Sequence, residues 1–165
     1  LFLLPGLSLI LCFGIFRILA GVWRLLGADC RPLFREPLRS KSLSEFWSRR
    51  WNLAFSEMTA AAVFRPLRGL FGKGPATFAA FVFSGLLHEL AISLSVHAGY
   101  GLPMLYFLLQ GAAVTWEENL TKRGCPIDAR PMVGRCWTAA WLVLPLPILF
   151  HPPFIEGVVL PLIGG

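Results

Sequence analysis

Residues 78–94 read Phe-Ala-Ala-Phe-Val-Phe-Ser-Gly-Leu-Leu-His-Glu-Leu-Ala-Ile-Ser-Leu, an apolar run that contains His88 and Glu89. With its flanking residues, the run is long enough to cross a bilayer as a helix. An ionisable side chain at membrane depth is costly, so it usually faces a polar cavity or pathway instead of lipid. His88 is therefore a candidate functional residue. The alternative is a structural histidine that is hydrogen-bonded to a neighbouring helix.

The composition is that of an integral membrane protein. Hydrophobic residues make up 56% of the 165 residues, with 14 Phe and 6 Trp, whereas an average soluble domain has roughly 45–50% apolar residues. Apolar runs recur along the whole chain, which excludes a lone secretory signal peptide. The four cysteines have no CxxC spacing, so the sequence indicates neither a zinc site nor a disulfide framework.

The apolar segments predict an all-α polytopic bundle of about four transmembrane spans. We place these spans at 2–26, 76–98, 104–118 and 137–150. The apolar tail 154–165 is too short to span as a helix, and we expect it to be re-entrant, interfacial or truncated.

The charge distribution predicts the orientation of these spans. Segment 29–73 holds nine of the fifteen Lys and Arg residues, the loop 119–136 holds four, and the turn 99–103 holds none. Alternating spans put both basic segments on one side, which the positive-inside rule makes cytoplasmic. This orientation explains the net charge of +6 without a nucleic-acid partner.

The basic segment also contains a predicted amphipathic helix. The run Ser42-Leu43-Ser44-Glu45 fits a capping box, with Ser42 as N-cap and Glu45 bonding back to it. From there to Ala61, large apolar residues fall on one helical face and polar residues on the other. We therefore expect one interfacial helix over 42–61, lying along the membrane plane.

Two motifs together resemble a known family. Residues 42–52 read Ser-Leu-Ser-Glu-Phe-Trp-Ser-Arg-Arg-Trp-Asn, and residues 83–89, in the apolar helix, read Phe-Ser-Gly-Leu-Leu-His-Glu. This pair resembles the membrane-bound O-acyltransferase (MBOAT) family and looks most like its wax synthase branch. The resemblance covers about 29–150 and implies that 1–165 is a single membrane domain, the C-terminal portion of a larger one.

The resemblance implies transfer of an acyl group from acyl-CoA to the hydroxyl of a lipophilic alcohol, in contact with membrane lipids and without a metal or bound redox cofactor. It carries His88 over as the catalytic histidine and Asn52 as its upstream polar partner. Around these two we predict a set of substrate-binding side chains. They are Trp47, Arg49, Arg50, Trp51, Ser84 and Glu89.

The chemistry of these side chains fits the roles. A neutral imidazole can take the hydroxyl proton during attack on a thioester, whereas an amide such as Asn52 is a poor base and is suited to holding a carbonyl or hydroxyl oxygen. Guanidinium groups match phosphate oxygens, which CoA carries, although Arg49 and Arg50 equally suit anionic lipid head groups. Ser84, His88 and Ser95 share one face of an ideal helix. A second stripe of Glu89, Ser93 and His97 is open to a structural role.

Other interpretations of the sequence stay open. His88 and Glu89 would relay protons or bind an ion in a transporter fragment, and the 42–61 helix would be only an anchor in a non-catalytic scaffold. Asn52 would then be a solvated surface amide. We interpret His97 and His151 as boundary residues, and Glu117 and Glu118 as solvated helix ends.

Overall fold

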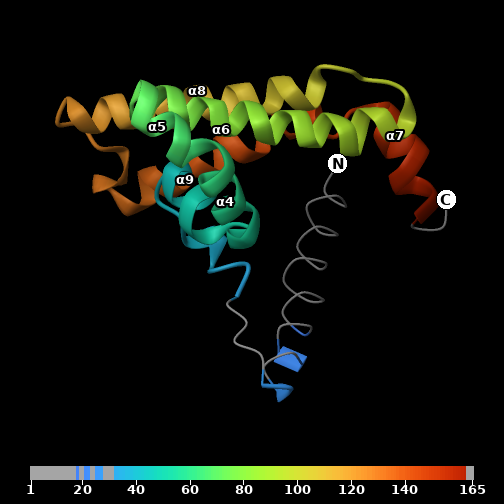
Figure 1. The fold of residues 1–165 in the computed structure, drawn as a ribbon, viewed down its shortest axis with the longest axis horizontal. Coiled ribbons are helices and arrows are strands. Elements are labelled where there is room, and N and C mark those ends of the chain that lie inside the picture. The colour runs from blue at the N-terminus through green and yellow to red at the C-terminus, as the bar shows by residue number, and fades with distance from the viewer. Residues whose placement is uncertain (1–17, 19–20, 23–24, 28–31, 163–165) are drawn as a thin grey trace.

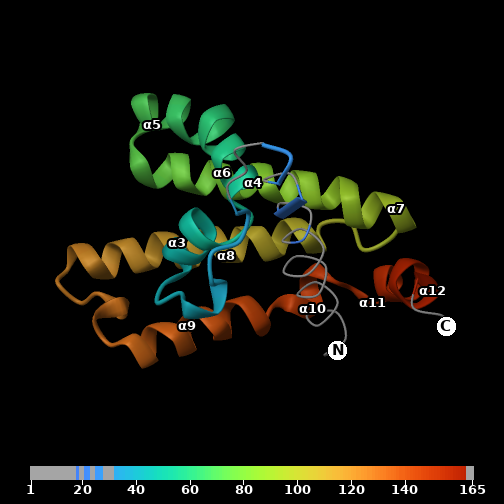
Figure 2. The same ribbon diagram turned by 90° about the horizontal axis from the view of Figure 1, so that it is seen from below.

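The computed structural model describes residues 18, 21–22, 25–27 and 32–162, and this part of the chain is helical, with no strand. Two long helices, α6 (Lys73–His88) and α8 (Leu102–Lys122), run side by side (Figure 1). Helices α4 (Leu53–Thr59) and α9 (Pro131–Val143) lie below this pair in Figure 1. In the view from below, α3 (Leu43–Glu45) lies against α8, and α9 runs beside α8 (Figure 2).

Small residues let α6 and α8 approach closely. A Cβ atom on Gly85 would lie 2.7 Å from Sδ of Met104, and one on Gly111 would lie 3.0 Å from Cβ of Phe81. Small residues at such crossings allow close backbone packing between membrane helices. The two helices are antiparallel because a short turn joins them, with His97, Gly99 and Gly101 all at positive φ.

Two described helical stretches are long and apolar enough to cross a membrane. The first, Lys73–Val96, has 24 residues and joins α6, the π-helical segment η5 (Glu89–Ser93) and α7 (Leu94–Val96). At 1.5 Å per residue it is about 36 Å long, enough for a hydrocarbon core of about 30 Å. The second, Pro131–Leu149, joins α9 and α10 (Leu146–Leu149).

These two stretches match the predicted spans 76–98 and 137–150. The predicted span 104–118 also forms a helix, α8, but α8 is not among the two candidates, since Gln110, Glu117 and Glu118 make it less apolar. The predicted span 2–26 lies mostly outside the described residues.

The predicted continuous helix over 42–61 is wrong, because the chain breaks at Asn52. Residues 43–50 form α3 and the π-helical segment η3 (Phe46–Arg50), and the chain then leaves the helix. Asn52 has φ 40° and ψ 65°, a left-handed conformation that Asn tolerates better than most residues. Helix α4 begins after it and continues through η4 (Ala60–Phe64) into α5 (Arg65–Phe71).

A non-helical segment around residues 33–35 forms backbone hydrogen bonds on both sides of this break. The backbone N–H of Arg35 donates to the carbonyl of Arg50 at 2.8 Å, and the N–H of Leu53 donates to the carbonyl of Leu33 at 2.9 Å. The short helix η2 (Pro37–Arg39) then leads to Ser42. These bonds satisfy backbone groups that the interrupted helix leaves free.

The chain ends in short helical turns that fold back on the bundle. After η6 (Ile127–Ala129), α9 and α10, the turns are α11 (Pro152–Phe154), η7 (Ile155–Val159) and α12 (Leu160–Leu162). A Cβ atom on Gly157 would lie 3.1 Å from Cγ1 of Val96, and Val159 is buried. The described part of the tail therefore packs against the end of the first long helix.

Candidate active site

His88 is half-buried at the end of α6, and its ring has a defined hydrogen-bonding state. Its Nδ1 lies 2.8 Å from the backbone carbonyl oxygen of Ser84, one turn earlier. A carbonyl can only accept, so Nδ1 carries the proton and, in the neutral ring, Nε2 presents a lone pair. Among the described residues, Nε2 has no hydrogen-bond partner. The ring is thus oriented as a base with its free nitrogen away from the helix backbone.

Aromatic rings from two other helices surround His88. Its ring centroid lies 4.3 Å from that of Phe107 on α8 and 6.3 Å from that of Phe55 on α4. The Trp47 ring in turn lies 5.9 Å from Phe107 and 6.1 Å from Phe81. The structure therefore brings the 42–52 motif and the His88 motif together through shared aromatic neighbours.

Asn52 shapes the break that puts α4 beside His88. Its side-chain oxygen accepts a bond of 3.4 Å from the backbone N–H of Phe55, so it is the N-cap of α4, a position that Asn favours. The amide nitrogen of Asn52 has no partner in the described part of the chain, and no hydrogen bond joins Asn52 to His88 there. The two predicted catalytic residues thus approach each other through Phe55.

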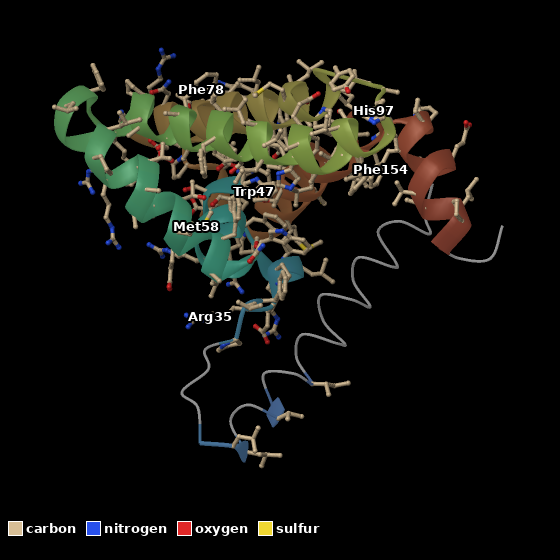
Figure 3. All side chains as sticks on the ribbon, turned by 45° about the vertical axis from the view of Figure 1, so that its right-hand side comes forward. Arg35, Trp47, Met58, Phe78, His97 and Phe154 are labelled. Atoms are coloured by element: carbon tan, nitrogen blue, oxygen red, sulfur yellow. The ribbon has the colours of Figure 1, made fainter. Side chains whose placement is uncertain are left out.

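Trp47 is fixed by a buried amide that sequence reasoning missed. Its indole N–H donates to Oε1 of Gln110 at 3.2 Å, and the amide nitrogen of Gln110 donates to the carbonyl of Trp141 at 2.6 Å. Gln110 is completely buried, and Trp47 lies in the middle of the molecule (Figure 3). A lone amide in an apolar helix is a usable sequence signal for such a bond.

Much of the aromatic face of the motif therefore packs inside the protein, with Trp47 on the helix pair. Phe46 is buried, and its ring stacks on Trp51 with centroids 5.4 Å apart. Trp51 also meets the Phe34 ring edge to face at 5.0 Å. These aromatic side chains of the predicted apolar face thus contact other parts of the protein.

The two motif arginines have different surroundings. Arg50 pairs with Glu45 at 2.7 Å and donates to the carbonyls of Arg35 and Glu36, each at 3.2 Å. Arg49 is exposed and has no ion-pair partner among the described residues. Arg50 thus joins the motif to the preceding chain, while Arg49 is available to an anion.

Glu45 is part of the local cap, although not in the expected geometry. Its backbone N–H donates to Oγ of Ser42 at 3.0 Å, as predicted, but its carboxylate accepts from the N–H of Lys41 at 2.8 Å instead of Ser42. Burial raises the pKa of Glu45, but the Lys41 hydrogen bond and the Arg50 partner together outweigh it, so the pKa lies below its ordinary value.

Glu89, beside His88, holds the next helix in place. Its carboxylate accepts from the backbone N–H groups of Gly101 at 2.6 Å and Met104 at 3.2 Å, at the start of α8. Ser93 on the same stripe is fully buried and donates to the carbonyl of Gly99 at 3.3 Å. These bonds support the structural interpretation of the second stripe, and they occupy both carboxylate oxygens of Glu89.

The first stripe is interrupted directly after His88. The π-helical segment η5 follows there, and such segments add a residue per turn and occur often at functional sites. Ser84 is buried, but Ser95 is exposed and donates to its own helix at the Ile92 carbonyl, at 2.7 Å. An ideal helical wheel therefore predicts the shared face of Ser84 and His88 correctly, but it does not predict the position of Ser95 after the π-helical segment.

Sequence analysis did not predict the burial of two further polar side chains. Glu117 is 4% exposed and not a solvated helix end, and the Glu118 side chain, which is 14% exposed, pairs with Lys73 at 3.0 Å. His151 lies at a helix boundary, as predicted, because it is the N-cap of α11, but it is 1% exposed. In both places the chain folds back over the polar side chain, which local sequence does not reveal.

An apolar groove lies away from these residues. It runs between the start of α6 and the end of α8 and includes Phe78, Trp116 and Asn119. Phe78 lies on the opposite side of α6 from Trp47 (Figure 3). No residue of this groove contacts the His88 ring. The described residues contain no cluster of three or more metal-ligating side chains.

Comparison with known proteins agrees with the motif pair. Residues 30–109, which include both motifs, match the model of the membrane bound O-acyl transferase family. These residues belong to that family. The resemblance expected from the sequence is confirmed.

Curated relatives extend the similarity along the chain. The chain is 34% identical over 154 residues to a probable long-chain-alcohol O-fatty-acyltransferase 7 from Arabidopsis thaliana, covering 86% of this chain and 44% of the relative. It is 32% identical over 145 residues to a probable long-chain-alcohol O-fatty-acyltransferase 9 from the same plant, covering 80% and 42%. The chain thus spans less than half the length of these relatives. No solved structure matches it.

Proposed function

We propose that this chain is part of a membrane O-acyltransferase that moves an acyl group from acyl-CoA to the hydroxyl of a lipophilic alcohol. The observation that carries the proposal is the state of His88. Its Nδ1–H is held by the Ser84 carbonyl, so Nε2 of the neutral ring is free to accept a proton. The family match of residues 30–109 and the names of the relatives support the same reaction class.

In the proposed reaction His88 is the general base. The alcohol oxygen attacks the thioester carbonyl carbon while Nε2 removes the hydroxyl proton. The tetrahedral intermediate then expels the CoA sulfur, so one C–O bond forms and one C–S bond breaks. The proton on Nε2 passes to the leaving thiolate, which returns His88 to the neutral state. No metal or redox cofactor takes part in this scheme.

Asn52 and Arg49 are the substrate-facing members of the proposed site. The unpartnered amide nitrogen of Asn52 is suited to donate to the developing oxyanion or to the alcohol oxygen. The exposed Arg49 guanidinium is suited to the phosphates of CoA. Arg50, Trp51 and Glu89 support this site through the contacts that hold the motif and α8, and Ser84 supports it through its carbonyl.

The proposal includes a multi-pass topology of about four spans, in contact with membrane lipids and with 29–73 and 119–136 on the cytoplasmic side. Single cysteines at Leu38, Tyr100 and Thr121, in a background without native cysteines, test it because all three side chains are exposed. We expect labelling of Leu38→Cys and Thr121→Cys from one side and of Tyr100→Cys from the other. Labelling of Leu38→Cys and Thr121→Cys from opposite sides contradicts this topology.

Release of free CoA tests the reaction itself. We expect the full-length protein to release CoA from acyl-CoA when long-chain alcohols are supplied, and His88→Ala to lose about 10²–10⁴-fold in turnover. The control is His97→Asn, because His97 is exposed and left-handed at φ 51° and Asn tolerates that conformation. Wild-type turnover by His88→Ala contradicts the proposed role of His88. Absence of CoA release by the wild type instead favours a transporter or scaffold.

A further inference from the structure

A buried carboxylate joins the motif to two helices. Glu117, in the last part of α8, is 4% exposed and accepts three hydrogen bonds. The backbone N–H of Leu43 donates to it at 2.8 Å, that of Ser44 at 3.1 Å, and the indole N–H of Trp137 on α9 at 2.7 Å. Both backbone partners precede Glu117 by more than 70 positions. We call these residues, 43–44, Glu117 and Trp137, the Glu117 latch.

The latch satisfies backbone groups at the point where the motif begins. The first N–H groups of a helical segment have no partner within it, and among the described residues Oγ of Ser42 accepts from Glu45 alone. Glu117 supplies acceptors for the two N–H groups between them. A buried backbone N–H without a partner is costly, so the carboxylate favours this one placement of the segment.

The surroundings of the latch leave the motif little room to move. Leu43 is completely buried. Gly134 on α9 faces the backbone of Lys41 so closely that a Cβ atom there would collide with the Lys41 carbonyl. The start of the motif is therefore enclosed between α8 and α9, which is also how the ribbons lie in Figure 2.

The latch connects to His88 through one turn of helix. Trp47 follows Leu43 by four residues, so both lie on the same side of the helical segment. The Trp47 ring contacts Phe107, whose ring lies 4.3 Å from that of His88. A shift at Leu43 would therefore move Trp47, and with it the break at Asn52, relative to the His88 ring.

We propose that Glu117 is a positioning residue for the acyl transfer proposed above: its carboxylate holds the start of the 42–52 motif on α8 and α9 and so sets where Trp47 and Asn52 lie relative to His88. The inference rests on the proposed function. Glu117 itself touches neither His88 nor Asn52, so it acts through the segment that it holds.

Glu117→Gln tests this role, and Glu118→Gln is its matched control. The amide keeps one acceptor oxygen but replaces the other with a donor, which cannot accept from Ser44. The control makes the same change one residue away, in a carboxylate that pairs with the exposed Lys73 side chain and not with the motif backbone. Hydrogen exchange over residues 41–47 and the kinetics of CoA release are measured for both variants in the full-length protein.

We expect faster exchange of the Leu43 and Ser44 amides in Glu117→Gln and a fall in kcat of about ten- to a hundredfold, because small misplacements of catalytic groups have effects of this order. We expect KM for acyl-CoA to change much less than kcat, and Glu118→Gln to match the wild type in both measurements. A variant that merely lowers the amount of folded protein would leave kcat per folded molecule unchanged.

Three results overturn the inference. One is wild-type kcat in Glu117→Gln, and a second is lost kcat without faster exchange at 43–44. If Glu117→Gln does not accumulate, Glu117→Asp is measured instead. Aspartate keeps the charge but is one methylene too short to reach every donor. Wild-type kcat in Glu117→Asp is the third result that would overturn the inference. Failure of the proposed function is distinct, because the wild type itself would then release no CoA.

Discussion

His88 and His151 are two histidines in apolar surroundings whose rings are set in opposite ways. Nδ1 of His88 donates to the Ser84 carbonyl, whereas Nδ1 of His151 accepts at 3.4 Å from the backbone N–H of Phe154 and caps α11. In the neutral rings, Nε2 is therefore a lone-pair acceptor in His88 and an N–H donor in His151. In the part of the chain that the structure describes, Nε2 of His151 is buried without a hydrogen-bond partner and lies against Gly99.

The comparison shows that burial alone does not make a histidine a base. His151 is the more buried ring, at 1% exposure, yet its free nitrogen carries a proton and faces backbone. His88 is half-buried, and in the neutral ring its Nε2 carries a lone pair. The backbone partner at Nδ1 decides the tautomer, and the tautomer decides which ring can accept a proton from a substrate.

The largest expected effect is a loss of turnover when His88, but not His151, is substituted. His88→Gln should lose about 10²–10⁴-fold in CoA release per folded molecule, since it removes the base. His151→Asn keeps a good N-cap for α11 and should retain turnover within a few fold while lowering the melting temperature. Turnover and thermal unfolding are measured on the same preparations. A loss of turnover in His151→Asn as large as that in His88→Gln would break the comparison.

Asn52→Gly should have the next largest effect. Glycine adopts the left-handed conformation freely and costs only a few tenths of a kcal/mol as an N-cap, so α4 should stay in place. Loss of the amide should lower turnover by about 10²–10³-fold, as for one oxyanion donor. Glu36→Gly is the matched control, because Glu36 is also left-handed, at φ 47°, but exposed. Equal turnover in the two variants would make Asn52 a purely structural residue.

The sequence predicted the elements around His88 well because they depend on local pattern. The apolar run 78–94 correctly predicted the first long helix. The capping box at Ser42 correctly predicted where the motif helix starts and the bond from the Glu45 N–H to Oγ of Ser42. The motif pair also pointed to two segments that the structure places against shared aromatic rings. Period and capping are properties of neighbouring residues, so they can be read without the fold.

The features that sequence reasoning missed depend on residues far apart in the chain. Glu117 looked like a solvated end because its partners, Leu43 and Ser44, lie more than 70 residues away. His151 is at a helix boundary as predicted, but its burial was missed because the turn at Gly99 covers it only in the folded chain. The break at Asn52 depends on backbone pairing with Leu33 and Arg35, which a helical wheel does not contain.

Gly99→Ala tests how tightly the His151 ring is packed against the turn at Gly99. A Cβ atom on Gly99 would collide with the His151 ring, and the residue has φ 73°. The control is Gly101→Ala, since Gly101 has φ 88° but open space around a Cβ atom. Both variants carry the left-handed strain of roughly 1–2 kcal/mol, and Gly99→Ala should lose a further 1–3 kcal/mol or so from overpacking. If thermal or denaturant unfolding shows equal losses of folding free energy in the two variants, the His151 ring can move aside at little cost.

The smallest expected effect concerns the ion pair between Glu45 and Arg50, which stabilises the 42–52 motif near His88. The pKa of Glu45 is lowered in the folded chain, so its contribution to stability is fully present above the ordinary carboxyl pKa and is lost as the pH falls through the lowered value. The pair is partly exposed, with 23% and 27% side-chain accessibility, so the contribution is on the order of 0.5 kcal/mol. The melting temperature of Glu45→Gln should therefore lie slightly below that of the wild type at neutral pH, and the two melting temperatures should converge in acid.

The control is Glu57→Gln, at an exposed position on α4, which should show no such pH-dependent difference. A Glu45→Gln difference that grows on acidification has the opposite sign and would show that the pair does not support the motif in the folded state.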